Sequence, residues 1–467
     1  MYGRPMSWEP VLDGDLAAEA RAAARAIALD LDRIDPARRS PVDEALMWAY
    51  VAGAFDDELS ASRFDAAIVA LHAHLEAPVS SLGLYGGLAG AGWVLAHVSE
   101  AADEFLTEVD GALIDALRDP WPFGGELIKG AAGLGVYFVE RLRGGAASAR
   151  PGIIRVVEQL AAMAETSPDG VAWFTEPQQL PAWQRELSPG GHYNLGVAHG
   201  IPGMIAFLGI VAELGERSDL GERSELGDLG DPALLAAARQ ARDLCERAGR
   251  WLRARELPPH PRSRYSAVVP REPREPREPG PRGRQLTSDS GSDPAVVPRE
   301  PREPREPERS RTAWCYGDPG IAVALWSAAA RTGADAAAWR ELALTAAARP
   351  LELCGVVDTP LCHGAAGLAH LYNRCFQASG DERFRQAARG WFEHTLAMRR
   401  PGEGVAGFTS RRARDPATDL TPVHTAAPDF LDGAIGVALA LLAAVGGDEP
   451  GWDRLLLCDL PPRPSPP

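Results

Sequence analysis

The sequence predicts an all-α fold, a closed ring of seven helical hairpins, on three observations. Strand signals are nearly absent, and alanine, leucine, arginine and glutamate dominate the composition. Apolar residues recur at the spacing of one helix face, as at Phe384, Ala388, Trp391 and Phe392. A Gly-x-x-Gly signature recurs along the chain, and each copy opens an apolar helix. Copies at equivalent places indicate an internal structural repeat.

Each repeat pairs a charged amphipathic helix with the apolar helix that follows it. A helix that is apolar all round must be buried, and an amphipathic helix can cover it. The apolar helices are therefore expected inside the ring and the amphipathic ones outside. The Gly-x-x-Gly copies are Gly87/Gly90, Gly130/Gly133, Gly200/Gly203, Gly317/Gly320, Gly364/Gly367 and Gly433/Gly436. The charged helices that precede them are predicted at 61–77, 101–118, 152–166, 231–256, 335–349 and 381–399.

The first hairpin is inferred from pattern alone, with a charged helix over 15–35 and an apolar helix over 41–55. It lacks the glycines of the other copies. Two stretches interrupt the repeat. Residues 213–231 predict a polar loop. Within 257–310 the string AVVPREPREPREP occurs at 267–279 and again at 295–307.

Proline at every third position of this insertion excludes helix and sheet and favours extended polyproline II. We expect residues 257–310 to form a solvated, disordered insertion within a single domain that spans 1–467. A docking site for a partner is the alternative interpretation of the insertion.

Charge and apolar patterning exclude several classes of protein. The net charge of −16 argues against a nucleic-acid binder, which needs a basic face. The first 20 residues carry no apolar core of a secretion signal, and apolar runs such as 434–445 are too short to span a bilayer. A cytoplasmic location is therefore expected. In that compartment free thiols or metal ligands are favoured over disulfides for the cysteines, which are Cys245, Cys315, Cys354, Cys362, Cys375 and Cys458.

Chemistry-bearing residues lie at the start of three repeats. Cys315 lies in WCYGDPG at 314–320, Cys362 and His363 in LCHGAAG at 361–367, and His199 in AHGIPG at 198–203. In a ring, equivalent positions converge on the axis, so these side chains should meet at one mouth. Two thiolates and an imidazole suit zinc, and three protein ligands leave the open position of a catalytic site. Ordinary buried thiols are the alternative.

The blocks WCYGDPG, CHGAAG and AHGIPG resemble the signature blocks of lanthionine synthetase C (LanC) proteins. The resemblance covers nearly the whole chain and leaves out only the proline-rich insertion. It implies an α/α toroid of seven inner and seven outer helices and one zinc ion held by Cys315, Cys362 and His363. It also implies lanthipeptide (lantibiotic) biosynthesis, in which lanthionine or methyllanthionine thioether rings form in a ribosomally made peptide.

The same resemblance suggests further site residues. His199 matches the family's catalytic histidine by position, and an imidazole titrates near neutral pH. Arg311 lies four residues before Cys315, where family members also carry arginine. It would stabilise the negative charge of an enolate intermediate or hydrogen-bond a zinc-bound thiolate. The alternative is an exposed arginine with no role in the site. Tyr316 is a candidate beside the site, with packing as its other role. Glu126 departs from the aspartate often found four residues before the third repeat's glycine; it would orient a catalytic group or act as a helix N-terminal acid.

The implied reaction is conjugate addition of a peptide cysteine to dehydroalanine or dehydrobutyrine. Zinc deprotonates a bound thiol. The zinc ion, two protein thiolates and one substrate thiolate together carry a charge of −1. Such an electron-rich centre favours alkylation of the thiolate over hydrolysis by a zinc-bound hydroxide. The expected partner is a dehydrated precursor peptide. A separate dehydratase is also expected, because the 467 residues contain no dehydratase module.

Three alternatives remain open from the sequence. A LanC-like enzyme could use the same zinc to add glutathione or another free thiol to dehydrated proteins. A peptide-binding scaffold would hold a purely structural zinc with a fourth protein ligand. A helical-toroid glycosidase would need paired carboxylates at the mouth, for which Glu126 and Asp318 are the obvious candidates, and it would leave the thiols unexplained.

Overall fold

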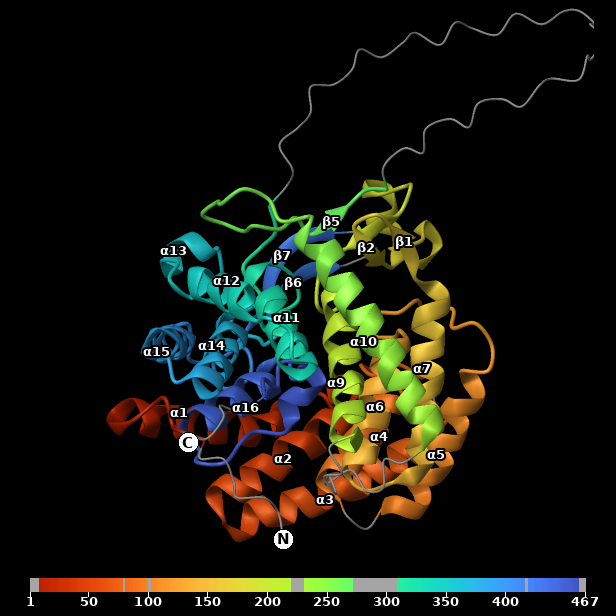
Figure 1. Cartoon of the computed structure of the whole chain (residues 1–467). Helices are drawn as coiled ribbons and strands as arrows, with labels where there is room; N and C mark the ends of the chain where they lie inside the picture. The colour runs from red at the N-terminus through yellow and green to blue at the C-terminus, as the bar shows by residue number, and fades with distance from the viewer. Residues whose placement is uncertain are drawn as a thin grey trace, which may run out of the picture.

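The computed structural model describes residues 8–78, 80–99, 102–219, 231–271, 309–415 and 419–461. The described helices form an inner and an outer layer (Figure 1). The inner helices are α2 (Pro41–Phe55), α4 (Leu88–Val98), α6 (Ala131–Arg143), α9 (Ile201–Asp219), α11 (Asp318–Thr332), α14 (Ala365–Ser379) and α16 (Ala434–Val445). The outer helices are α1 (Gly14–Asp30), α3 (Glu58–Glu76), α5 (Asp103–Ala116), α7 (Arg150–Met163), α10 (Pro232–Arg253), α12 (Ala337–Ala347) and α15 (Glu382–Ala397).

The inner helices form a closed ring. Each one contacts the next along the chain, from α2 through α4, α6, α9, α11 and α14 to α16, and α16 contacts α2. Every residue of α16 from Ala434 to Val445 is buried, whereas α10 buries one face only. This is the difference expected between an enclosed helix and a covering one. The predicted all-α toroid is confirmed.

The repeated second glycine has a common geometric cause. In every copy, a Cβ on that glycine would overlap the carbonyl oxygen of the residue six positions earlier. The pairs are Gly90 with Leu84, Gly133 with Leu127, Gly203 with Val197, Gly320 with Trp314, Gly367 with Leu361 and Gly436 with Phe430. The loop before each inner helix therefore folds back onto that helix's first turn, and only glycine leaves room for it.

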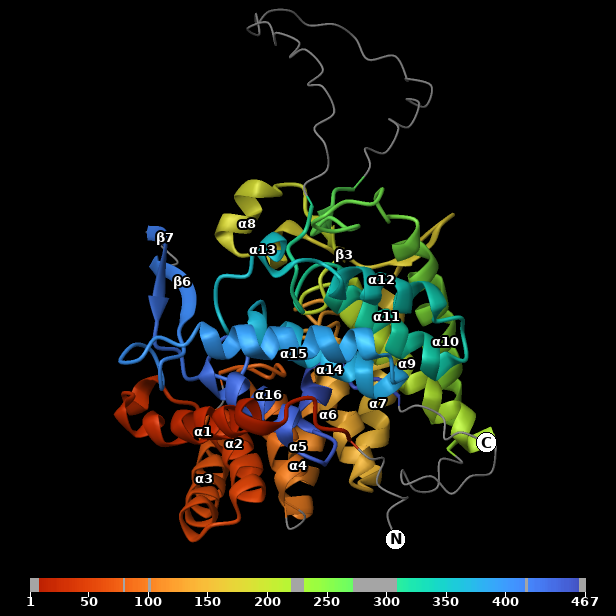
Figure 2. The same cartoon turned by 90° about the vertical axis from the view of Figure 1, so that its left-hand side faces the viewer.

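Small sheets and short helices lie at one end of the toroid. They were not predicted from the sequence. β1 (Glu165–Ser167) pairs with β2 (Gly170–Ala172); β3 (Phe174–Thr175), β4 (His192–Asn194) and β5 (Val268–Val269) form a second antiparallel sheet; and β6 (Ser410–Asp415) pairs with β7 (Asp419–Thr425). The short helices are α8 (Ala182–Leu187) and α13 (Leu351–Cys354). Figure 2 shows the β6–β7 ribbon, α8 and α13 at the same end of the molecule. Strands of two to seven residues are too short for their periodicity to be recognised in sequence.

Two predicted boundaries are corrected. The polar loop predicted at 213–231 begins too early, because α9 continues to Asp219 and Glu213 pairs with Arg331 of α11 at 2.6 Å. Residues 220–230 lie outside the described part of the chain. At the start of the predicted insertion, Ser263 and Tyr265 are buried and Val268 pairs with β4, so 257–271 belongs to the folded body. The disorder expected for 272–308 falls outside the described residues.

The segment after α16 lies inside the ring. It contains a 3-10 helix, Trp452–Leu456. Its backbone and side chains bond to Tyr50 of α2, Glu140 of α6, Arg331 of α11 and Arg374 of α14. Because these partners belong to different inner helices, the segment fills the interior and ties the helices together.

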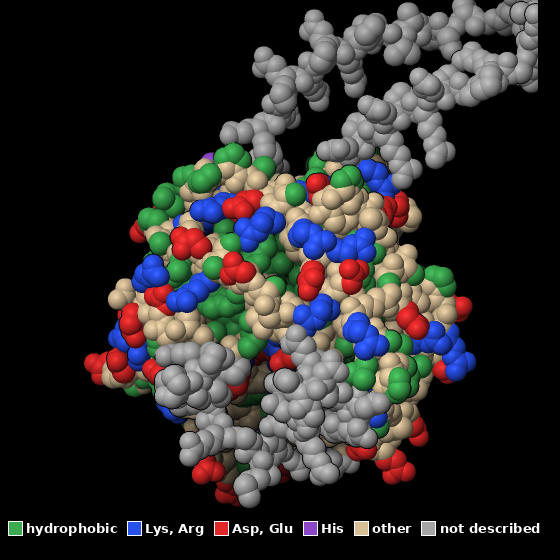
Figure 3. All heavy atoms as spheres, in the orientation of Figure 1, with side chains coloured by type: hydrophobic (Ala, Val, Ile, Leu, Met, Phe, Trp, Pro, Cys, Tyr) green, Lys and Arg blue, Asp and Glu red, His purple; other side chains and the backbone are tan. Residues whose placement is uncertain are grey.

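Among the described helices, none is both long and apolar enough to cross a membrane. On the face shown in Figure 3, acidic and basic side chains are interspersed. That face does not show the uniformly basic surface that nucleic-acid binding requires.

Candidate metal and catalytic centre

The loops that precede the inner helices are joined to one another by backbone hydrogen bonds. We call this connected row of loops the loop belt. These bonds run from Tyr85 N to Ile128 O, Leu127 N to Ala198 O, Val197 N to Cys315 O, Cys315 N to Cys362 O and Cys362 N to Leu431 O, at 2.9–3.2 Å. The belt holds residues from distant repeats beside one another. It places Cys315 directly against Cys362.

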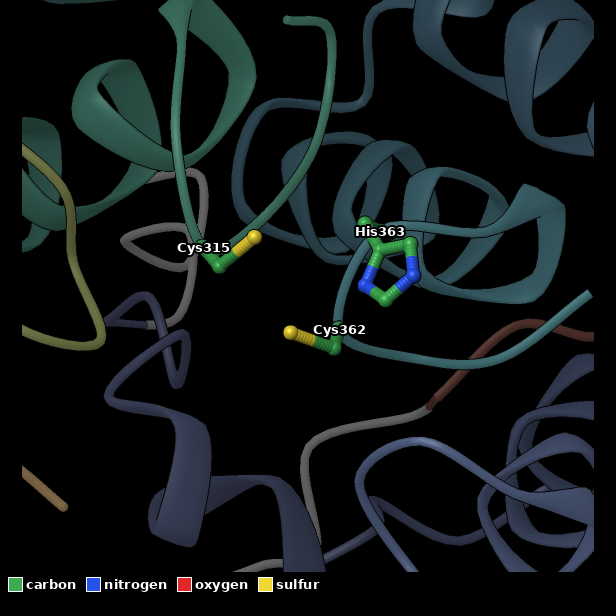
Figure 4. Close-up of side chains that lie close together, drawn as sticks. All are labelled: Cys315, Cys362 and His363. Atoms are coloured by element: carbon green, nitrogen blue, oxygen red, sulfur yellow. The ribbon is translucent and has the colours of Figure 1, made fainter. Parts of the chain in front are cut away.

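Cys315, Cys362 and His363 form one group at this belt (Figure 4). Their candidate ligand atoms all lie within 4.8 Å of one another, and both cysteines are free thiols. Gly317 lies two residues after Cys315, directly before α11, and has a φ of 103°. Glycine adopts this conformation readily, so the chain can turn sharply from the Cys315 loop into α11.

Two carboxylates surround the histidine of this group. Asp358 Oδ2 lies 3.5 Å from His363 Nε2 and also accepts a hydrogen bond from Arg411 N of β6 at 3.0 Å. Asp432 Oδ1 lies 3.6 Å from His363 Nδ1. Two sulfurs and an imidazole backed by a carboxylate are a donor set that fits zinc, because metal-bound histidines commonly have such an outer partner.

The two thiols have opposite proton affinities. The hydrogen bond from Cys362 lowers the pKa of Cys315 against the opposing effect of burial, with a further contribution from His363. The pKa of Cys362 is raised by the same hydrogen bond and by burial. Burial lowers the pKa of His363, but Asp358 and Cys315 outweigh it and raise the value to about 10. The group therefore stabilises negative charge on the sulfur of Cys315.

His199 is paired with Glu126 at the same mouth. Its Nδ1 lies 2.8 Å from Glu126 Oε2, and its side chain remains 51% exposed. Burial lowers the pKa of His199, but the bond to Glu126 and the negative charges of Glu126 and Cys315 raise it overall. Glu126 also accepts backbone hydrogen bonds from Ile128 and Gly130 at the start of α6. Glu126 therefore contacts both the His199 ring and the start of α6.

The remaining sequence candidates flank Cys315. The Arg311 side chain is exposed, and its charge lowers the pKa of Cys315. The hydroxyl of Tyr316 accepts a hydrogen bond from Asn194 Nδ2 at 2.8 Å. Burial raises the pKa of Tyr316 to about 12, with the charge of Cys315 as a further cause.

Sequence reasoning missed Asp358, Asp432 and Asn194. Asp358 lies five residues before His363 and Asp432 directly precedes Gly433, but a single acid near a motif carries no signal of its own. Asp318, by contrast, is fully buried and accepts a hydrogen bond from Ser263 Oγ at 2.7 Å. It is a structural acid, so it cannot form the carboxylate pair of a glycosidase with Glu126.

A second group, His370, Asp453 and Cys458, also has the composition of a metal site. All three are buried, and Asp453 is already held by His370 Nε2 at 2.6 Å and by two nitrogens of Arg374. The buried carboxylate is therefore neutralised by arginine, and the group ties the interior segment to α14.

Comparisons with a family model and with solved structures both find matches. A family model described as lanthionine synthetase C-like protein matches residues 44–222 and 288–457. Among solved structures, 13 chains match, and one of them is a nisin cyclase. That match has a TM-score of 0.62 and 17% sequence identity, and it covers 94% of this chain and 97% of the cyclase. At this identity the likeness establishes the fold. No curated protein matches by sequence.

Proposed function

This chain belongs to the lanthionine synthetase C-like family, and on that premise we propose that it is a zinc-dependent cyclase. The reaction adds cysteine thiols to dehydroalanine or dehydrobutyrine within a peptide and forms lanthionine or methyllanthionine rings. One observation carries the proposal: Cys315, Cys362 and His363 meet at the mouth that also holds the His199–Glu126 pair. The fold shared with a nisin cyclase supports it.

Cys315, Cys362 and His363 would hold the zinc ion, with Asp358 orienting the imidazole. A zinc ion bound by these residues lowers the pKa of a substrate thiol and so supplies a thiolate nucleophile at neutral pH. Within the part of the chain that the structure describes, the group of candidate ligands at this belt has three members. Three protein ligands favour the open site of a catalyst over the closed site of a scaffold.

His199 serves as the acid–base residue. When Nδ1–H donates to Glu126, Nε2 carries the free lone pair, and the exposed ring can reach a substrate. It accepts the proton that the substrate thiol loses when the thiolate forms, before the sulfur–carbon bond is made. The π electrons of the dehydroamino acid move onto its carbonyl, and the enolate then takes a proton from His199 at the α-carbon. No oxidant is required.

Arg311 and Tyr316 act at the reacting centre. The exposed guanidinium of Arg311 lies close enough to lower the pKa of Cys315, and its positive charge would stabilise the enolate. Tyr316 is held by Asn194, which fixes its ring beside Cys315. The substrate is a dehydrated precursor peptide, and a separate dehydratase supplies it.

Elemental analysis of the purified protein tests the metal centre. We expect about one zinc per chain, lost in both Cys315→Ala and Cys362→Ala. Cys375→Ala is the matched control, because Cys375 is a buried free thiol in α14 outside the cluster, and it should keep the metal. Zinc that is absent from the folded wild type, or retained in both variants, would overturn the proposal.

A peptide with one cysteine and one dehydroalanine then tests the reaction. Cyclisation consumes the thiol without changing the mass, so the product should resist alkylation by N-ethylmaleimide. Added glutathione distinguishes the two enzymatic alternatives. A mass increase by one glutathione, with no ring formed, would assign the chain to intermolecular thiol addition instead.

A further inference from the structure

Within the described residues, the loop belt does not close around the ring. Its backbone bonds run without a break from Tyr85, before α4, to Leu431, before α16. Between these two ends lies the first hairpin, whose inner helix α2 begins without Gly-x-x-Gly. Here a side chain replaces the backbone contact: Phe430 N donates to Asp43 Oδ2 at 3.1 Å. The repeat that lacks the glycines therefore leaves a gap in the belt.

A cavity of about 580 Å³ occupies this gap. Its three main walls come from the start of α2 with the residues before it, from α4 with the loop before it, and from the loop before α16; His74 of α3 and Leu455 of the interior segment also line it. Volumes of this size are typical of ligand sites, which range from about 300 to 1,000 Å³.

The cavity borders the candidate metal centre through three of its lining residues. Leu431 O accepts the backbone hydrogen bond of Cys362 at 2.9 Å. Asp432 Oδ1 lies 3.6 Å from His363 Nδ1. The pKa of Tyr85 is raised by burial and then by the charge of Cys362. A peptide whose cysteine is held at the metal centre has its neighbouring residue about 3.8 Å along the backbone, which brings that residue to this border.

The lining is suited to an apolar side chain. Val42, Leu84, Ala91, Val94 and Phe430 supply carbon surface from all three walls. Three of the charged groups at the cavity are hydrogen-bonded: Arg39 donates two bonds of 2.6 Å to Glu44, Asp429 accepts one of 2.6 Å from Arg412, and Asp43 is engaged by Phe430 N. The fourth, Asp432, faces His363. Burial also raises the pKa of Asp43 to about 7, so its negative charge is weakened at neutral pH.

We propose that this cavity binds the apolar side chain of the residue adjoining the reacting cysteine, and so selects which substrate cysteines react. The assignment rests on the proposed function, because the thiol anchors the peptide at the metal centre. In this assignment, the first hairpin, which is the one repeat without Gly-x-x-Gly, provides the part of the ring that distinguishes one substrate sequence from another.

Isothermal titration calorimetry on the zinc-loaded full chain tests the assignment with three capped probes: acetyl-Cys-amide, acetyl-Leu-Cys-amide and acetyl-Cys-Leu-amide. We expect one of the leucine probes to bind about 10-fold or more tighter than acetyl-Cys-amide, because a leucine side chain becomes buried. Val42→Trp should fill the cavity and abolish this advantage while leaving acetyl-Cys-amide unchanged. Val69→Trp is the matched control, because Val69 is 70% exposed on α3 and does not line the cavity.

The outcomes separate the cavity from the metal centre. If acetyl-Cys-amide binds but neither leucine probe binds more tightly, or if the advantage persists in Val42→Trp, the cavity assignment alone is overturned. If none of the probes binds, the thiol site fails and the proposed function fails with it. Thermal unfolding verifies that Val42→Trp is folded; should it not fold, Ala91→Leu fills the same cavity from α4 and takes its place.

Discussion

His199 Nδ1 lies 2.8 Å from Glu126 Oε2, although 73 positions separate the two residues in sequence. The loop belt brings them together, because Leu127 N donates to Ala198 O between the same two loops. Glu126 is also held by backbone donors at the start of α6, so its carboxylate has little freedom to turn away. With Nδ1 engaged by Glu126, Nε2 is the ring nitrogen of His199 that is left for a substrate.

Glu126→Gln should lower the pKa of His199 toward its ordinary value, because the neighbouring negative charge is lost. The limb of the pH–rate profile that reports His199 should move to lower pH. We expect kcat to fall by about 10- to 100-fold, less than the 10²–10⁴-fold expected for loss of His199 itself. Histidine NMR titration measures the pKa directly. Glu126→Asp keeps the negative charge and should keep most of the rise in the pKa of His199. If the His199 limb of the pH–rate profile does not move in Glu126→Gln, Glu126 does not position His199.

Asp358→Asn should weaken zinc binding by about 10- to 100-fold, because the histidine loses a charged outer partner. Competition with a chelator of known affinity measures the change. Asp65→Asn, an exposed carboxylate on α3, is the control and should leave the affinity unchanged. An Asp358→Asn protein that binds zinc as tightly as the wild type would show that Asp358 does not orient His363.

Gly367→Ala and Gly390→Ala should change stability in opposite directions. A Cβ at Gly367 would overlap the carbonyl oxygen of Leu361 and displace the loop that carries Cys362, so the protein should lose stability and zinc affinity together. At Gly390, in the interior of α15, a Cβ meets nothing within 4 Å, and alanine should stabilise the helix by about 0.5–1 kcal/mol. Urea unfolding of both variants gives the comparison. Equal effects would contradict the close approach at Gly367.

The stability of the protein at acid pH should depend on Glu140 of α6, which accepts a hydrogen bond from Arg454 of the interior segment. Burial raises its pKa, but the hydrogen bond from His97 and the charge of Arg454 outweigh burial and lower it from 4.5 to about 2. A depressed carboxyl pKa contributes stability above the unfolded value, and that contribution is lost as pH falls from about 4.5 through about 2. The shift corresponds to about 3 kcal/mol at neutral pH.

Glu140→Gln should therefore lower the free energy of unfolding at pH 7 and flatten its dependence on pH between these two values. Chemical denaturation at a series of pH values measures both effects. Glu158→Gln, which removes an exposed partner of Arg155 on α7, should change stability by less than about 1 kcal/mol. Equal losses for the two variants would show that the buried contacts of Glu140 with His97 and Arg454 do not stabilise the folded state.

Local patterns were sufficient for the helices and for the positions of the thiols. Every predicted helix is present within a few residues of its expected bounds, because apolar spacing and Gly-x-x-Gly act over one or two turns. The predicted convergence of Cys315, Cys362, His363 and His199 on one mouth required only that equivalent repeat positions meet in a ring. The short strands and the end of α9 at Asp219 were missed because packing, not periodicity, decides them.

By itself the sequence determined the ring, its two layers and the residue types that converge at its mouth, because a repeated local signal specifies a repeated local structure. Only the tertiary structure decided which acid faces each imidazole, Glu126 beside His199 and Asp358 beside His363. It also decided that the segment after α16 fills the interior and that the first hairpin leaves a cavity beside the thiols. These features depend on contacts between loops far apart along the chain, and such contacts leave no periodic trace in a single sequence.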